Sequence, residues 1–296
     1  MKRREFLLHS AALTVGTALA THWTAAQETK KGLNLGLTTY MIGSKWTIPE
    51  LIEFLPKFGI FAVECRTDMK FAHGVELDSP KSVRTEAAKR FADSPVKLVG
   101  VACGERFDSP DAEKLQKSIE RTKELMQFCV DLGAPGLRVF PNDFQKDVPQ
   151  EKTLEQIADS LKKLAPTADS LGVELRLEAH GNVGLLPNLA KIAQAVNHPK
   201  VRVMLNSDFR DTKDAGLSAN FELVKPFLGG IVHIHDLTAE SYTEAKFYET
   251  QFAFLKKAGW NGFCLLEIGD KPDNEERFAE IAKQKAHWDE LMVAIG

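Results

Sequence analysis

The sequence is poor in cysteine, and its few cysteines are scattered. Cys65, Cys103, Cys129 and Cys264 are the only four in 296 residues, and no two form a CxxC pair or any metal-finger spacing. This pattern argues against a zinc-finger module or a fold held by a disulfide framework. Three of the four lie in strand-like runs, so we expect buried thiols. A disulfide between Cys65 and Cys103, on neighbouring strands, is the alternative.

The sequence also lacks a concentrated positive charge. Its formal net charge is −3, and no stripe rich in lysine and arginine occurs anywhere along it. A nucleic-acid surface requires clustered positive charge, so we expect no nucleic-acid partner.

Beyond the first two dozen residues, no apolar run is long enough to span a bilayer. The N-terminus reads MKRREFLLHSAALTVGTALATHWTAAQE, with Arg3 and Arg4 in its basic start, then a modest apolar run and small residues near positions 20 and 26. This layout is typical of a signal peptide, and the arginine pair resembles a twin-arginine signal; an ordinary Sec signal is the alternative. We therefore predict a signal peptide over residues 1–26, cleaved near 20 or 26. Residues 27–296 would form a domain that is periplasmic or otherwise exported and has no stable membrane anchor.

The remaining chain alternates short apolar runs with longer amphipathic ones. Hydrophobic residues make up 44% of the sequence, enough for a large core. The strand-like runs share a richness in Val, Leu and Ile, as expected for strands covered on both faces. They lie at residues 32–40, 60–66, 96–103, 136–140, 173–180, 201–207, 230–236 and 263–269.

Sequence signals for the beginnings and ends of helices lie between these runs. Thr153 with Gln156, Thr47 with Glu50, and Ser241 with Glu244 have the spacing of capping boxes. Gly133 and Gly172 follow two amphipathic stretches, where a helix C-terminus is expected.

A glycine-rich phosphate loop is absent after the first strand, where the sequence reads TTYMIGSK. That absence disfavours a doubly wound open sheet. Eight strand–helix units without a composition break instead predict a single-domain (β/α)8 TIM barrel, a fold that typically needs about 250 residues.

Polar residues follow several of the predicted strands, at the end of the barrel where active sites lie. They are Glu64, Glu178 with His180, Asn206 with Asp208, His233 with His235, and Glu267. Each alone has a structural explanation, such as a helix cap or a hydrogen-bonded core histidine. Strand alternation, however, directs Glu178 and His233 into the barrel together, and Glu267 also follows an apolar run. Oxygen and nitrogen ligands of this kind suit Mn²⁺, Mg²⁺, Co²⁺ or Zn²⁺.

The motifs LRLEAHG, VRVMLNSDFRD, VHIHDL and CLLEIGD, in this order, resemble those of sugar phosphate isomerase/epimerase barrels of the xylose-isomerase-like group. The opening LNLGLTTY and the strand IFAVECR, which carries Glu64, are similar to that group as well. The resemblance covers essentially the whole mature chain. It implies one divalent metal, held by Glu178, His233, Glu267 and an Asp on strand six.

The chain departs from this pattern at strand six, where Asn206 stands in place of the usual Asp. An amide oxygen can bind a hard cation but carries no charge, so it is a weaker ligand. Asp208, two residues on, is the alternative ligand. The departure leaves metal binding open.

The resemblance also implies a mechanism in which Glu178 and Glu267 act as an acid/base pair on a carbon next to a carbonyl. Glu64, Arg138, His180 and His235 are then candidate contacts to a sugar or keto-sugar substrate. Barrels of this group often pair, so a homodimer is also compatible with the resemblance.

Three other functions remain on the same scaffold. A lyase or dehydratase acting on a 3-keto sugar or inosose would begin with the same proton abstraction. A sugar-binding barrel without catalysis would explain Asn206. An endonuclease IV-like repair enzyme fits poorly, because few of the histidines lie at strand ends.

Overall fold

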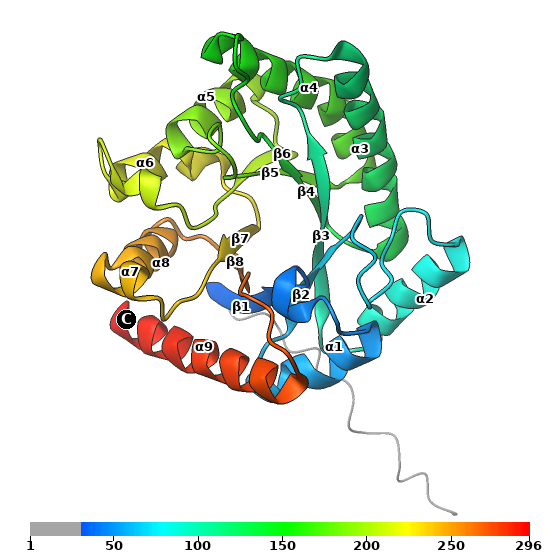
Figure 1. Ribbon diagram of the computed structural model, residues 1–296, viewed down its shortest axis with the longest axis vertical. Helices are drawn as coiled ribbons and strands as arrows, with labels where there is room; N and C mark the ends of the chain where they lie inside the picture. The colour runs from blue at the N-terminus through cyan, green and yellow to red at the C-terminus, as the bar shows by residue number, and fades with distance from the viewer. Residues whose placement is uncertain (1–30) are drawn as a thin grey trace, which may run out of the picture.

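The computed structural model describes residues 31–296, which form a barrel of eight parallel strands surrounded by helices (Figure 1). The predicted signal peptide lies outside these residues. The strands are β1 (Leu33–Thr38), β2 (Ala62–Arg66), β3 (Lys97–Arg106), β4 (Gly136–Phe140), β5 (Glu174–Glu178), β6 (Val201–Met204), β7 (Ile231–Ile234) and β8 (Gly262–Leu266). Each of the eight predicted runs contains or overlaps one of them, so the prediction of a single-domain TIM barrel is confirmed.

The helices lie outside the strands and cover the barrel on all sides (Figure 1). The α-helices are α1 (Ile48–Phe54), α2 (Lys81–Ala92), α3 (Ala112–Leu132), α4 (Gln150–Leu171), α5 (Leu186–Val196), α6 (Leu217–Val224), α7 (Glu240–Glu244), α8 (Phe247–Lys257) and α9 (Asn274–Ala294). Short 3-10 helices are η1 (Met41–Gly43), η2 (Leu55–Phe58), η3 (Phe209–Thr212) and η4 (Lys225–Phe227). Among these helices, none combines the length and the apolar character that crossing a membrane requires.

The strands follow the order β6-β5-β4-β3-β2-β1-β8-β7, with parallel pairing throughout. The barrel closes between β6 and β7 through few backbone hydrogen bonds. Gly229 N donates to Val203 O at 2.8 Å, and His233 N donates to Leu205 O at 2.9 Å. The other neighbouring strands are joined by parallel ladders, so this seam has the least regular hydrogen bonding in the barrel.

The interior of the barrel contains a small apolar cluster of Ala62, Val99, Met204, Ile231 and Leu265, which is separate from the larger core between strands and helices. Burial of apolar surface in that larger core is the main stabilising contribution to the fold.

A buried arginine, Arg176, crosses the lower barrel. Its Nε donates to Glu174 at 2.6 Å, and its Nη1 donates to Val99 O at 2.8 Å. A Cβ at Gly100 would lie 2.7 Å from this guanidinium, and one at Gly136 would lie 2.4 Å away. Glycine at these two strand positions therefore provides the space that the arginine occupies.

The helix termini confirm some of the predicted caps and contradict others. Thr47 and Glu50 form the predicted capping box, and Gly133 and Gly172 end α3 and α4 with positive φ. The box predicted at Thr153 is wrong, because α4 begins three residues earlier, after Pro149. The box predicted at Ser241 is also wrong, because α7 follows Ala239 without a side-chain cap.

All four cysteines are buried and free, so the Cys65–Cys103 disulfide that the sequence left open is not formed. Burial raises the pKa of the Cys103 thiol to about 12. Such thiols are poor nucleophiles, which agrees with a packing role.

The loop after β2 is held to β1 by a buried histidine. His73 Nδ1 accepts the backbone N–H of Val75 at 3.0 Å, and its Nε2 lies 3.1 Å from the hydroxyl of Thr39. Burial lowers the pKa of His73 to about 4. Between pH 6.5 and 4 the unfolded chain therefore binds one more proton than the folded protein at this position, and stability falls as the pH falls.

We expect His73→Asn, which keeps an acceptor for Val75, to reduce this pH dependence. The free energy of unfolding of the parent should fall by about 2–3 kcal/mol more than that of the variant between pH 7 and pH 4.5. Urea unfolding in the presence of a chelator at both pH values measures the difference. If both proteins lose the same free energy of unfolding, His73 has the same pKa in the folded and unfolded states, which would contradict the prediction.

Candidate active site

Five charged side chains meet inside the upper barrel, at the carboxyl ends of the strands. Glu64 comes from β2, Arg138 from β4, Glu178 from the end of β5, His233 from β7, and Glu267 directly follows β8. All are buried except Glu267, which is partly buried. Parallel strands place their carboxyl ends at one edge, and strand alternation turns these residues inward.

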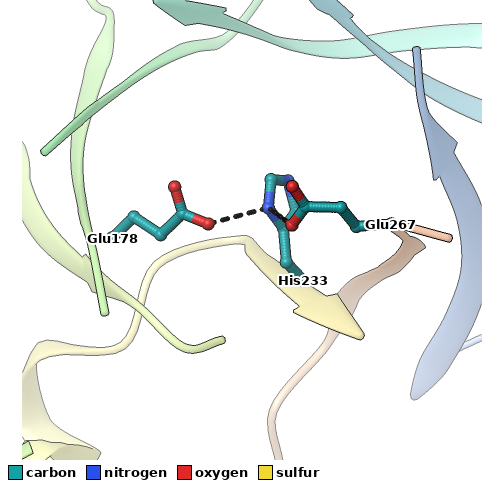
Figure 2. A group of neighbouring side chains, drawn as sticks. All are labelled: Glu178, His233 and Glu267. Carbon is teal, nitrogen blue, oxygen red and sulfur yellow. Dashed lines mark hydrogen bonds and ion pairs between the residues drawn. The ribbon is translucent and has the colours of Figure 1, made fainter. Parts of the chain in front are cut away.

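His233 lies at the centre of the group. Its Nδ1 is 2.9 Å from Glu178 Oε1 and 3.1 Å from Glu267 Oε2, and its Nε2 is 2.7 Å from Glu64 Oε2. Figure 2 shows Glu178 and Glu267 approaching the imidazole from opposite directions, and both lie near its Nδ1. The sequence-based expectation that these residues face a common point thus agrees with the geometry.

The three carboxylates control the charge of this histidine. Burial alone would lower the pKa of His233, but Glu178, Glu64 and Glu267 outweigh it and raise that pKa well above its ordinary value. Burial likewise opposes ionisation of Glu178, yet Arg138 and His233 hold its pKa below the usual range. The pKa of Glu267 is also lowered, chiefly by His233 against the effect of burial. Without a metal, the group is an imidazolium among carboxylates.

Arg138 pairs with one of the glutamates. Its Nε lies 3.0 Å from Glu178 Oε2, and its Nη1 donates to Cys103 O at 2.7 Å. The guanidinium carbon lies 4.0 Å from the centre of the Phe140 ring. Arg138 therefore orients Glu178, and its contacts place it beside the carboxylates.

The donor set fits a divalent cation. One ligand atom each from Glu178, His233 and Glu267 lies within 4.8 Å of the others. Glu178 Oε2 and Glu267 Oε2 are buried and have no hydrogen bond of good geometry among the described residues, although they lie near Arg138 Nε and His233 Nδ1. Glu64 binds the opposite nitrogen of His233, the arrangement that commonly orients a metal-binding histidine. A metal requires neutral imidazole, so its binding would release a proton and weaken as the pH falls.

Of the two candidates for a ligand from the β6 end, Asn206 contacts the group through its amide nitrogen, and Asp208 is engaged by Arg210. The amide nitrogen of Asn206 donates to Glu178 Oε1 at 2.9 Å, and its oxygen accepts the N–H of Ser207 at 2.7 Å. Asp208 accepts hydrogen bonds from Arg210 and lies at the start of η3. In this structure neither side chain directs an oxygen to the three-residue group.

This arrangement gives Asn206 a testable role. We expect Asn206→Asp to bind Mn²⁺ about 10-fold more tightly than the parent, because it adds a charged oxygen next to Glu178. The same change should destabilise the metal-free protein, since a donor becomes a fourth acid. Titration calorimetry and unfolding in chelator measure the two effects.

Asn206→Ala is the matched control for this prediction, because it removes the donor without adding charge. An Asp variant that binds Mn²⁺ no better than the Ala variant would contradict the role assigned to Asn206.

Two predicted substrate contacts lie at the edge of the site. His235 is half-buried, with Nδ1 3.2 Å from the hydroxyl of Tyr242 and Nε2 3.7 Å from Glu267. His180 is exposed, bonds Asn142 at 2.9 Å and packs against Phe140. His235 thus adjoins the carboxylates, whereas His180 lies at the rim.

Sequence reasoning missed two residues near the site. Tyr248 on α8 receives the backbone N–H of His235 at 2.8 Å and bonds Ser207 at 2.8 Å, linking the ends of β6 and β7. No local pattern marks this helix residue. Arg66 lies two positions after Glu64 on β2, so strand alternation could have placed it inside the barrel.

A hollow of about 600 Å³ opens at the opposite, N-terminal end of the barrel. Leu33, Phe61, Phe263 and Trp288 form its apolar lining, with lysines around it. The group of carboxylates and imidazole lies at the other end, so we assign the chemistry there.

The family is shown by a sequence model. Residues 52–288 match the model described as xylose isomerase-like TIM barrel. The chain belongs to this family. No curated protein sequence is significantly similar to it.

Solved structures agree on the fold of this xylose isomerase-like barrel. A 3-keto-D-glucoside 4-epimerase from E. coli superposes with a TM-score of 0.64 at 11% identity, covering 87% of this chain and 100% of that one. D-psicose 3-epimerase with D-tagatose, from Clostridium cellulolyticum H10, gives 0.69 at 15% identity, covering 88% and 99%. The IOLI protein with a bound zinc atom gives 0.68 at 17% identity, covering 88% and 97%.

Proposed function

We propose that this protein is a metal-dependent sugar isomerase or epimerase that transfers a proton at a carbon next to a carbonyl. The observation that carries the proposal is the convergence of Glu178, His233 and Glu267 within 4.8 Å at the carboxyl ends of three strands. Several structures with the same fold are sugar epimerases by name, which supports the substrate class.

The two glutamates would exchange the proton. Both have lowered pKa values, so each is ionised at neutral pH and able to accept a proton from carbon. Reaching the reacting centre from β5 and from the end of β8, one ionised glutamate would remove the proton on its face. The other, after taking up a proton from solvent, would deliver it to the opposite face, and the first would release its proton to solvent. Arg138 would hold Glu178 in place through the 3.0 Å contact.

Glu178, His233 and Glu267 would hold the metal, whose positive charge would polarise the substrate carbonyl. Glu64 would keep the imidazole oriented through its 2.7 Å contact with Nε2. Mn²⁺, Mg²⁺, Co²⁺ and Zn²⁺ are all compatible with these donors. We further propose that the protein acts after export through its twin-arginine-type signal, and that it pairs as a homodimer.

Two alternatives share the site. A lyase or dehydratase acting on a 3-keto sugar or inosose would use the same first proton transfer and then expel a leaving group. The likeness to a 3-keto-D-glucoside 4-epimerase supports keto-glycosides as a substrate class. A sugar-binding barrel without catalysis is favoured by Asn206, which directs its amide nitrogen to Glu178.

Incubation of the metal-loaded protein with ketoses and 3-keto-glycosides in D₂O separates these functions. Recovered sugar that carries deuterium next to the carbonyl, together with its epimer or isomer, supports the proposal. An unsaturated product supports the lyase. Sugar binding without deuterium incorporation rules out proton transfer and supports the binding barrel.

A further inference from the structure

Arg66 is a buried arginine whose side chain has no partner among the residues that the structure describes. It lies at the carboxyl end of β2, on the same strand face as Glu64, and is 9% exposed. Its guanidinium makes no hydrogen bond or ion pair with the residues that the structure describes, and its Nη1 is fully buried without a partner. A buried cation is unfavourable unless an anion or several acceptors compensate it.

The other buried arginines in residues 31–296 show how unusual this is. Arg138 pairs with Glu178, Arg176 with Glu174, and Arg277 with Asp270. Each also donates to a backbone carbonyl. Among the four, Arg66 alone is without such contacts.

The acids around Arg66 are already engaged elsewhere. Glu64 pairs with His233 at 2.7 Å, and Glu178 pairs with Arg138 and His233. Asp68, two residues after Arg66, pairs with Arg121 at 2.5 Å. None of these three carboxylates makes an ion pair with Arg66, although Asp68 and Glu178 are near enough to raise the pKa of its guanidinium.

The surroundings of Arg66 favour an added anion. Burial and, next, repulsion by Arg138 lower the pKa of its guanidinium. Gly104 on β3 lies close to the guanidinium, since a Cβ there would lie 3.3 Å from Nη2, and the absence of a side chain gives the arginine room. An anion at this point would offset both the burial and the repulsion.

We propose that Arg66 forms an anion subsite beside the acid/base pair, and that the sugar substrate carries a carboxylate there. A guanidinium matches the planar carboxylate with two parallel N–H donors. One unpartnered arginine supplies a single positive charge, which suits a carboxylate better than a phosphate dianion. The substrate class is thus a polyhydroxy keto acid, an inference that rests on the proposed function for its reacting centre.

Three ketoses that differ only at C6 test this subsite: D-fructose, D-fructuronate and D-fructose 6-phosphate. Glycolate and ethylene glycol form a second anionic and neutral pair that is independent of sugar stereochemistry. Dissociation constants are measured by titration calorimetry on the full mature protein loaded with Mn²⁺. We expect each carboxylate to bind about 10- to 100-fold more tightly than its neutral counterpart.

In Arg66→Met the dissociation constants of the neutral and anionic ligands should differ by no more than about threefold. Arg66→Lys should retain part of the preference for the anion. Arg90→Met removes an exposed charge that pairs with Glu86 on α2 and is the matched control, for which the parent ratio is expected. Both pairs of anionic and neutral ligands are tested at equal metal loading. A preference that comes from direct binding of the carboxylate to Mn²⁺ would therefore persist in Arg66→Met, whereas one that comes from the subsite would be lost.

Equal affinity for anionic and neutral ligands in the parent, including no binding of either, would overturn the subsite. So would an Arg66→Met variant that keeps the preference. Tighter binding of D-fructose 6-phosphate than of D-fructuronate, lost in Arg66→Met, would overturn the carboxylate and assign a phosphoryl group. An Arg66-dependent preference without deuterium exchange would instead contradict the proposed function and leave the subsite standing.

Discussion

Glu178→Gln and Glu267→Gln should each abolish interconversion of the sugar epimers, with a loss on the order of 10³-fold or more. Glutamine keeps the shape and an oxygen acceptor but cannot take a proton from carbon. Because the two glutamates would act on opposite faces of the carbon, the variants should differ in residual exchange. Each should exchange solvent deuterium into one epimer only, and the two patterns should be complementary.

Rates of epimer formation and of deuterium incorporation, measured from both epimers, check this prediction. Glu290→Gln is the control, because Glu290 is an exposed carboxylate on α9 paired with His287. It should behave as the parent does. A Glu178→Gln or Glu267→Gln variant that interconverts epimers at the parent rate would exclude that glutamate as an acid/base group.

His233→Ala should weaken Mn²⁺ binding at least about 100-fold, since it removes a ligand from a set of three. The same change leaves Glu64, Glu178 and Glu267 without their shared partner, so the metal-free protein should also be less stable. His233→Gln, which keeps a polar side chain of similar reach, separates loss of the ligand from misfolding. Titration of each variant with Mn²⁺ and circular dichroism of the metal-free forms give the two quantities.

His287→Ala, at a partly exposed histidine on α9 that lies outside the site, is the matched control for metal binding. It should bind Mn²⁺ as the parent does. Folded His233→Gln and His233→Ala that bind Mn²⁺ with parent affinity would show that the ion lies elsewhere.

The barrel could be predicted from the sequence because the alternation of apolar and amphipathic runs occurs eight times. Eight apolar runs separated by amphipathic stretches allow few topologies, and an error at one strand end does not change the fold. The capping boxes predicted at Thr153 and Ser241 are wrong because a capping-box spacing specifies only a possible hydrogen bond, and not where a helix begins. Here α4 begins after Pro149 and α7 begins after Ala239, so both residues lie inside a helix.

The site was only partly accessible from the sequence. Strand alternation brings Glu178 and His233 inside because it depends on local geometry alone. The direction of the Asn206 amide depends on Glu178 and Ser207, which only the folded chain places beside it. Arg66 lies on the predicted inward face, yet its lack of a partner depends on how Glu64, Glu178 and Asp68 are engaged across four strands and a helix.

The metal content of the purified mature protein, measured by elemental mass spectrometry before and after reconstitution, tests the central claim most directly. The account predicts close to one Mn, Co, Zn or Mg per chain in the parent and a loss of this metal in His233→Ala. A folded parent that holds no divalent metal even after reconstitution would contradict metal-dependent proton transfer and would favour the sugar-binding barrel.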